Sequence, residues 1–249
     1  MNGLEGPHSQ ILLNSRPVFS GLAGVYGLEL IPTSIIEKVE VVRGGGSVLF
    51  GSNAIAGTIN IILKEPIANN YEVGALYNSI GVGLDGSAGA ANDYTVNANA
   101  SVLSDNHNTG VTLYGFARER EVFDANNDSF SEQAPITNLT FGTRLYHKIS
   151  SRDKVSFDFF ALKEERDGGN MQDYPLHQRE IAEAVKHNMY VGGVTFFRIF
   201  RSYDLLTIYG TGQFLNRDSY YGAEYSLTDY GNSKDRTYNI GAHYKAVFE

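Results

Sequence analysis

The sequence predicts a mostly β protein, in which a glycine-rich first unit is followed by about eight antiparallel strands of a larger transmembrane β-barrel. Three observations support this prediction. From residue 71 onward, segments of roughly ten residues alternate polar and apolar side chains, as barrel strands do. The connections between these segments alternate between short and long. No segment has the roughly 20 consecutive apolar residues that a membrane-spanning helix needs, so a membrane-spanning form would be a barrel.

Composition limits the classes of function. The chain has 249 residues and 42% hydrophobic content, which allow one large folded domain or two small ones. Its net charge of −8 and its scattered basic residues argue against a nucleic-acid partner. The absence of cysteine excludes disulfides and thiolate metal sites. Residues 1–8 lack a secretory signal pattern, which predicts a fragment, a mature piece or a product of internal initiation.

The first unit opens with a short predicted strand at residues 11–13 and a turn at residues 14–17. Residues 19–27 are mostly small and predict a loop. Residues 38–41 alternate polar and apolar side chains, which predicts a half-buried strand that the glycines at 44–46 end. The apolar run at 59–62 predicts its partner strand. A phosphate-binding interpretation of the glycines lacks the Gly-Lys-Ser/Thr ending and the following helix that it requires.

Residues 35–64 also resemble the plug-domain signature of TonB-dependent outer-membrane receptors. The matching elements are Ile-Glu-Lys-Val-Glu-Val-Val-Arg-Gly at 36–44, Gly-Ser-Asn-Ala-Ile-Ala-Gly at 51–57 and Ile-Asn-Ile-Ile at 59–62. The resemblance implies that residues 1–67 are the C-terminal part of a plug and that residues 68–249 begin a TonB-dependent β-barrel. It also implies that the loop at 19–27 is apical. The ligand contacts expected there are Ser20, Leu22, Val25 and Tyr26, although Leu22 and Val25 could equally pack inside the plug.

The resemblance assigns a locking role to Arg43, because an arginine at this position of the family pairs with barrel glutamates. A buried charge needs such a partner. The expected partners lie beyond Glu249, so we expect Arg43 to be exposed or unpaired. The exception would be a substitute among the glutamates of the present strands, which are Glu119, Glu121, Glu164 and Glu165.

Eight strands are predicted, at residues 72–83, 94–103, 109–121, 137–147, 154–165, 187–199, 204–217 and 236–248. The long connections are predicted at 84–93, 122–136, 166–186 and 219–235, and the short ones at 104–108, 148–153 and 200–204. A soluble sandwich also alternates, but long extracellular loops and short periplasmic turns favour a barrel. Tyr and Phe near the strand ends would form its interfacial girdles.

The strand count predicts part of a larger barrel. Barrels that enclose a plug have about 22 strands, whereas about eight leave an interior filled by side chains. The alternative is a self-contained small outer-membrane barrel that acts as a passive pore or structural protein, with the first unit as a periplasmic appendage.

One long connection contains a candidate calcium site at Asp124, Asn126, Asp128 and Glu132. Oxygen ligands at alternate loop positions converge on one point, as a hard cation requires. The pattern departs from an EF-hand, because Ser129 replaces the glycine at the sixth position and Glu132 falls at the ninth. The region resembles the extracellular calcium loops of cobalamin receptors. A solvated acidic loop without a metal is the alternative.

The next long connection, at residues 168–187, predicts a short helical stretch after Pro175. Its acidic and imidazole side chains are His177, Glu180, Glu183 and His187. They lack the His-Glu-x-x-His pattern, so a lid or a partner-docking surface is the better interpretation. No Gly-x-Ser-x-Gly elbow, cysteine nucleophile or other catalytic pattern is present, and we expect no enzyme.

The resemblance therefore implies a receptor and active transporter in the outer membrane of a Gram-negative bacterium. Its ligand would be a scarce chelated nutrient, cobalamin or a ferric siderophore, held without covalent chemistry and without a required cofactor. The TonB energy-transducing complex would be its partner, pulling on the plug. Outer-membrane lipid and a surface lipoprotein are further candidate partners.

Overall fold

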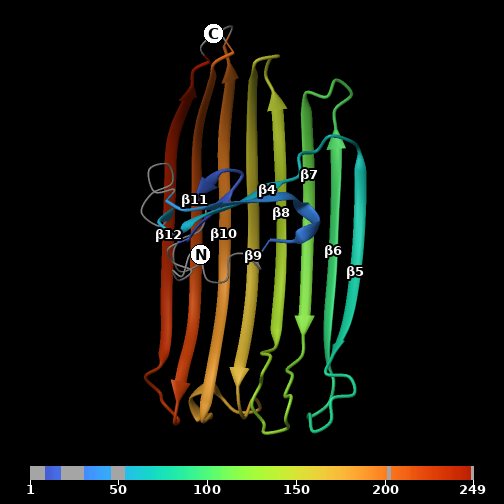
Figure 1. The fold of residues 1–249 in the computed structure, drawn as a ribbon, viewed down its shortest axis with the longest axis vertical. Coiled ribbons are helices and arrows are strands. Elements are labelled where there is room, and N and C mark those ends of the chain that lie inside the picture. The colour runs from blue at the N-terminus through green and yellow to red at the C-terminus, as the bar shows by residue number, and fades with distance from the viewer. Residues whose placement is uncertain (1–8, 18–30, 46–53, 201–202, 248–249) are drawn as a thin grey trace.

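In the computed structural model, residues 9–17, 31–45, 54–200 and 203–247 are described, and they form two sheets (Figure 1). The small sheet contains β1 (Ser9–Leu13), β2 (Arg16–Pro17), β3 (Ile36–Arg43) and β4 (Gly57–Leu63) in the order β2-β1-β4-β3. β4 pairs in parallel with β1 and antiparallel with β3. The strands predicted around residues 11–13, 38–41 and 59–62 are therefore confirmed. A short 3₁₀ turn, η3 (Thr33–Ile35), precedes β3.

The turn between β1 and β2 is a two-residue hairpin. Leu13 pairs with Arg16, and the residues between them, Asn14 and Ser15, have φ values of 50° and 64°. Positive φ at both central positions is the geometry of a type I′ turn, which asparagine tolerates better than most residues. The turn predicted at residues 14–17 is thus confined to Asn14 and Ser15, because Arg16 and Pro17 form β2. It places the Asn14 side chain at the end of the small sheet.

The large sheet contains eight strands, each hydrogen-bonded antiparallel to the next in chain order. They are β5 (Asn70–Ile80), β6 (Ala91–Leu103), β7 (Thr109–Arg120), β8 (Ile136–Lys148), β9 (Asp153–Gly169), β10 (Ile181–Ile199), β11 (Leu205–Ala223) and β12 (Tyr230–Lys245). Within the described residues β5 and β12 pair only on one side, so the sheet is open. The closed small barrel considered as the alternative is therefore not the observed architecture.

The predicted connection lengths were only partly correct. The short connections lie together at one end of the sheet and the longer ones at the other (Figure 1). However, β9, β10 and β11 have 17, 19 and 19 residues and extend through much of the predicted loops 166–186 and 219–235. The predicted helical stretch after Pro175 is only the 3₁₀ turn η5 (Leu176–Gln178). In the described part of the chain no helix is long and apolar enough to cross a membrane.

Outward charged side chains lie where the predicted strands 154–165 and 187–199 meet these extensions. Glu165 on β9 bonds Lys163 at 3.1 Å and Lys186 on β10 at 2.7 Å. Charged residues of this kind interrupt the apolar alternation that indicates a barrel strand. Cross-strand ion pairs nevertheless support the ladder. The strands therefore continue where the hydrophobic pattern stops.

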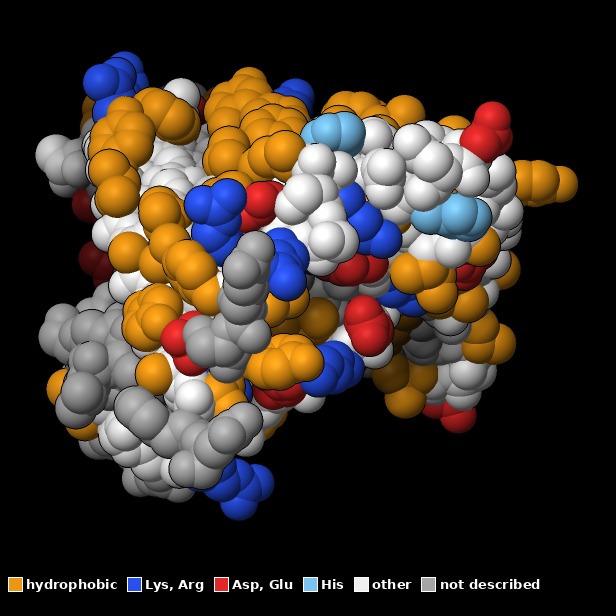
Figure 2. Space-filling view, turned by 90° about the horizontal axis from the view of Figure 1, so that it is seen from above, with side chains coloured by type: hydrophobic (Ala, Val, Ile, Leu, Met, Phe, Trp, Pro, Cys, Tyr) orange, Lys and Arg blue, Asp and Glu red, His pale blue; other side chains and the backbone are white. Residues whose placement is uncertain are grey.

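The two faces of the large sheet differ in polarity. On β8 the burial alternates residue by residue, with Leu139 and Phe141 exposed on the outer face and Thr140 and Arg144 buried on the inner face. The outer face carries further exposed apolar side chains, including Val73, Val96, Val194, Ile208 and Ile240. Viewed from the end with the short connections, hydrophobic side chains occupy much of the rim, and charged side chains gather mainly in the interior (Figure 2).

The small sheet crosses the inner face of the large sheet about midway along its strands (Figure 1). Both sheets contribute to one hydrophobic cluster. Its members are Ile11, Leu13, Ile31, Ile35, Ile61 and Leu63 from the N-terminal unit and Tyr114, Phe160, Leu162, Met189, Val191 and Leu215 from the large sheet. β1 and β4 supply most of the buried small-sheet residues because they are its central strands.

The expectation of a half-buried strand at residues 38–41 was wrong. Val39, Val41 and Val42 on β3 are 51%, 54% and 57% exposed. β3 is the edge strand of the small sheet, and its one ladder partner is β4. Because β1 and β4 occupy the contact with the large sheet, the alternating pattern of β3 meets no packing surface among the described residues.

Candidate functional site

A charged cluster joins the end of the small sheet to the inner face of the large sheet. At its centre is Arg144 on β8, which is 9% exposed. Its Nη1 donates to the Leu63 carbonyl at 3.1 Å, and its Nη2 bonds Glu65 Oε1 at 3.3 Å. Its Nε lies 3.6 Å from Asp158 Oδ1 on β9. Lys154, also on β9, reaches Glu65 Oε1 at 2.8 Å. Arg144 thus binds the last residue of β4 and the segment that follows it.

Asn14 closes the same cluster from the β1–β2 turn. Its Nδ2 donates to Asp158 Oδ1 at 3.5 Å, and its Oδ1 accepts the Leu63 amide at 3.0 Å. Its own backbone amide donates to the Ile61 carbonyl at 2.8 Å. Hydrogen bonds therefore join the turn to the end of β4 and, through Asp158, to β9 of the large sheet.

The electrostatics keep Glu65 ionised. Burial by itself would raise the pKa of the Glu65 carboxyl, but the hydrogen bonds and charges of Lys154 and Arg144 outweigh burial and lower it. Charge-assisted hydrogen bonds of this kind are stronger than neutral ones. Glu65 is 40% exposed at its side chain, so water screens part of the attraction.

A second contact lies beside this cluster. The Arg16 guanidinium of β2 stacks 4.0 Å from the centroid of the Tyr209 ring on β11. Arginine over an aromatic face is attracted by the ring quadrupole. The charged cluster and the stacked pair together hold the small sheet against β8 to β11.

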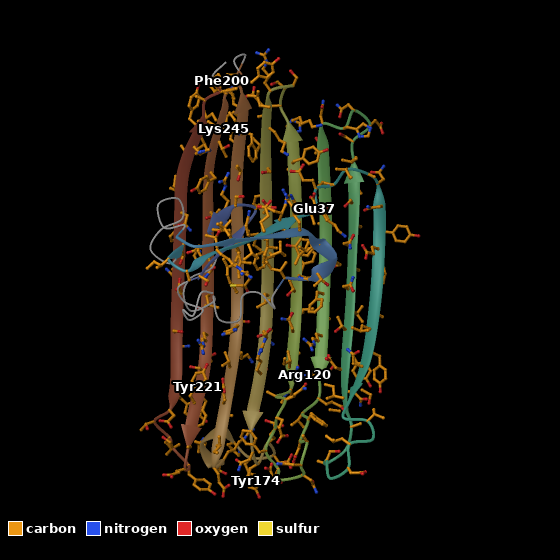
Figure 3. All side chains as sticks on the ribbon, in the orientation of Figure 1. Glu37, Arg120, Tyr174, Phe200, Tyr221 and Lys245 are labelled. Carbon is orange, nitrogen blue, oxygen red and sulfur yellow. The ribbon has the colours of Figure 1, made fainter. Side chains whose placement is uncertain are left out.

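The opposite flank of the small sheet is much less tightly packed. A groove of about 630 Å³ separates η3, β3 and the segment after β4 from β5, β6 and β7. Its lining combines polar and apolar side chains. The polar ones include Ser34, Glu37, Glu72, Asn99, Ser101 and Thr112, and the apolar ones are Ile35, Leu63, Ile67 and Tyr114. Glu37, which is labelled in Figure 3, lies on this flank and lines the groove. By contrast, the space beside Arg144 and Asp158 is about 50 Å³. Arg144 borders both, so it lies between the tight contact and the groove.

The predicted calcium ligands come together in the connection between β7 and β8. Carboxylate oxygens of Asp124, Asp128 and Glu132 lie within 4.8 Å of one another. Asn126 joins them, because its Nδ2 donates to Asp128 Oδ2 at 3.0 Å. Backbone amides already use several of these oxygens: Asp124 accepts four of them, and Glu132 accepts that of Ala125 at 2.6 Å. The loop therefore holds its shape through its own amides.

The other predicted site residues are less informative. Ser20, Leu22, Val25 and Tyr26 lie outside the described residues. Arg43 is exposed at the end of β3, and no ion pair joins it to a glutamate in the described part of the chain. Glu164 instead bonds Arg166 at 2.8 Å and Asn138 at 2.8 Å within the large sheet. The locking role of Arg43 stays a prediction.

The connection between β9 and β10 is organised by an arginine and not by a metal cluster. Arg179 is 4% exposed, and its guanidinium bonds Asp167 and the carbonyls of Tyr174 and Gln172. His177 bonds the Tyr230 hydroxyl at 3.0 Å. Tyr174 lies at the end of the large sheet opposite Phe200 (Figure 3). Among the described residues, the acidic group around Asp124 is the one geometric candidate for a metal.

Sequence reasoning missed the charged cluster. Its one local signal was Arg144 itself, the only charge at the inward positions of the predicted strand 137–147. An inward arginine on a mostly uncharged strand face requires a partner. That partner, Glu65, lies 79 positions away in the sequence, and no local pattern links the two residues.

Comparison with known proteins decides the family. Residues 1–58 match the model of the TonB-dependent Receptor Plug Domain. The chain belongs to the TonB-dependent receptors. The small sheet is therefore part of the plug, and the large sheet is part of the barrel wall. Arg144 and Asp158 belong to the wall, whereas Asn14 lies within the matched plug domain and Glu65 follows β4.

Relatives by sequence are vitamin B12 transporters. The chain is 33% identical over 140 residues to the vitamin B12 transporter BtuB of Vibrio vulnificus strain CMCP6, covering 56% of this chain and 20% of that protein. For BtuB of strain YJ016 the identity is 30% over 177 residues, covering 68% and 26%. The match thus spans about a quarter or less of these relatives.

Solved structures show the same fold at low sequence identity. The siderophore receptor PirA of Acinetobacter baumannii superposes with a TM-score of 0.75 and 18% identity, covering 100% of this chain and 39% of that one. A Q482A mutant of the ferric enterobactin receptor PfeA of Pseudomonas aeruginosa gives 0.71 and 15%, covering 98% and 39%. Both receptors contain far more chain than the region that matches here.

Proposed function

We propose that the receptor to which this chain belongs binds a bulky chelated nutrient outside the cell and imports it across the outer membrane. Residues 1–67 serve as plug, and residues 68–249 form part of the wall. The TonB complex supplies the energy by pulling on the plug. The observation that carries this proposal is a plug sheet packed across the polar inner face of a wall whose outer face is apolar. Such a wall suits lipid outside and water inside.

Of the two ligand classes, cobalamin has the better support. The relatives with the higher identity are named vitamin B12 transporters. The siderophore receptors PirA and PfeA are 18% and 15% identical to the chain, and identity at that level supports a shared fold but not a shared ligand. Ferric siderophores remain the second candidate. Ser20, Leu22, Val25 and Tyr26 are the proposed plug contacts for either ligand.

Uptake in cells tests this function. Cells that lack their own cobalamin and enterobactin receptors would express the complete receptor and be given labelled cobalamin or labelled ferric enterobactin. We expect accumulation of cobalamin that stops when TonB is deleted. Equal accumulation with and without TonB would instead support a passive pore, and accumulation of ferric enterobactin alone would reverse the ligand assignment.

Calcium binding in the β7–β8 connection is part of the proposal. Asp124, Asn126, Asp128 and Glu132 would hold the ion, and the bound ion would relieve repulsion among the three carboxylates. Calorimetric titration of calcium into the receptor should give heat that Asp128→Ala removes and Asp105→Ala, in a short turn, retains. Equal heats, or none, in all three proteins would mean that backbone amides alone organise the loop.

The connection between β9 and β10 is the proposed docking surface for a partner such as a surface lipoprotein. Its support is the set of Arg179 bonds, which hold the backbone of residues 172–174 in one shape. A preformed loop loses less conformational entropy on binding.

A further inference from the structure

We infer that Arg144 is the pivot of the plug. During transport it keeps the end of β4 seated on β8 and β9, while the plug separates from the wall along the groove that faces β5 to β7. That groove becomes the passage for the ligand. This inference rests on the proposed function, and it adds which contact stays fixed and which one opens.

The fixed side is argued from the density of bonds at one point. Arg144 engages Leu63, Glu65 and Asp158 through its three nitrogens. Asn14 adds a bond from the β1–β2 turn to Asp158, and Lys154 adds one to Glu65. Removing one partner of such a cluster leaves the remaining, partly buried charges without full compensation, which makes stepwise opening unfavourable.

The opening side is argued from the lack of such bonds. The groove of about 630 Å³ separates plug from wall, and polar side chains line part of it. The Oγ of Ser34, beside the groove, has no hydrogen-bond partner among the described residues. Among the described residues, separation on this flank therefore breaks few protein–protein bonds.

The chemistry of the groove also suits a passage. Ser101 on β6 and Thr112 on β7 share a hydrogen bond of 2.8 Å and present hydroxyls to the space, and Glu37, Glu72 and Asn99 add further polar groups. A chelate with polar groups on its surface would exchange bonds with water for bonds with this lining. Its bulk exceeds a groove of pocket size, so the plug must move away from β5 to β7 for it to pass.

Two cross-links distinguish a pivot from a moving contact. The chain contains no cysteine, so introduced pairs react selectively in this region. One pair, Ser34→Cys with Ser101→Cys, spans the groove. The other, Glu65→Cys with Lys154→Cys, replaces an ion pair of the pivot. Both would be made in the complete receptor and joined by the same short bismaleimide. Arg16→Cys with Tyr209→Cys serves as a second pivot pair if the first fails to fold.

We expect the two cross-links to act in opposite ways. Joining the groove pair should reduce uptake of labelled cobalamin to background while binding to whole cells is unchanged. Joining the pivot pair should leave uptake within about twofold of the unlinked variant. Loss of uptake on linking the pivot, or normal uptake with the groove linked, would overturn the inference.

The unlinked variants separate this inference from the proposed function. Folded, unlinked variants and wild type should take up cobalamin or ferric enterobactin in a TonB-dependent way. If they take up neither probe, the proposed function fails before the pivot is tested. If the unlinked variants transport and the cross-links act as expected, the results support both the proposed function and the pivot.

Discussion

Individual residues at the plug–barrel interface have unequal roles. Arg144 contacts the plug and the wall at once, whereas Arg43, on the opposite edge of the plug sheet, is exposed. The difference follows from position, because β8 faces the hydrophobic cluster and β3 does not. Removing Arg144 should therefore disturb the contact between the plug sheet and β8 and β9.

Arg144→Ala should weaken plug retention. It leaves Asp158 and Glu65 without their shared cation, and breaking a buried charged pair costs about 3–5 kcal/mol. Water screening of Glu65 places the expected loss near the lower end of that range. Chemical denaturation of the complete receptor in detergent, followed by plug release, measures it. Arg152→Ala, in the exposed connection between β8 and β9, is the matched control. Equal stability of the two variants would contradict a structural role for Arg144.

The interface should also depend on pH. The pKa of the Glu65 carboxyl is lowered in the folded protein. Ionised Glu65 therefore stabilises the folded form at pH values above the carboxyl's unfolded pKa. That stabilisation is lost as pH falls through the lower folded-state pKa, because the protonated carboxyl no longer attracts Lys154 and Arg144. Asp158 faces the same arginine and titrates as well, so the comparison with Glu65→Gln isolates the Glu65 part. Plug release measured from neutral to acidic pH should be less pH-dependent in Glu65→Gln, and an identical profile would contradict the assignment.

At the scale of elements, the pairing of β7 with β8 positions a wall side chain that packs against the plug. Tyr114 on β7 lies opposite Gly142 on β8, and its buried ring belongs to the cluster that packs on the plug. A Cβ at Gly142 would meet that ring. Because Gly142 has no side chain, the Tyr114 ring can occupy this position beneath the plug.

Gly142→Ala should move Tyr114 and loosen the hydrophobic contact. Overpacking of this kind costs about 1–3 kcal/mol. Gly115→Ala on the neighbouring strand is the control, because its nearest neighbour would be the Thr140 carbonyl at 3.9 Å. Thermal unfolding of both variants in detergent tests the idea. It fails if Gly142→Ala unfolds at the wild-type temperature.

Strand positions were predictable from local pattern, whereas strand ends were not. Alternation located all eight strands of the wall, but a charged outward residue, Lys186, interrupts the apolar pattern in the extension of β10. For the candidate site, the acidic loop at Asp124 was predictable because its members are neighbours in sequence. The Arg144 cluster was not, because its members come from different elements.

At the scale of the whole molecule, the open wall has consequences for solubility. β5 and β12 each have one ladder partner in the described structure. Tyr71 and Val73 on β5 are 85% and 71% exposed, and Tyr238 and Ile240 on β12 are 64% and 88% exposed. Unpaired backbone beside apolar side chains favours association with other chains.

Residues 1–249 expressed alone should therefore be insoluble without detergent. Size-exclusion chromatography of the refolded chain is the measurement, with and without a mild detergent. Replacing Tyr238 and Ile240 by Thr should reduce aggregation by lowering the apolar area of the edge. A monodisperse, detergent-free monomer would show that the chain covers its own edges.

The sequence alone determined the mostly β fold, the order of plug and wall, and the inward or outward direction of most wall side chains. These features depend on the two-residue repeat of a strand and on turn residues, which are local properties of the backbone. Only the tertiary structure decided that β3 is exposed among the described residues, that Arg144 meets Glu65, and that a groove lies between plug and wall on one flank. Those features depend on how the plug sheet is seated across the wall, and because its contacts join residues far apart in the chain, no local pattern encodes them.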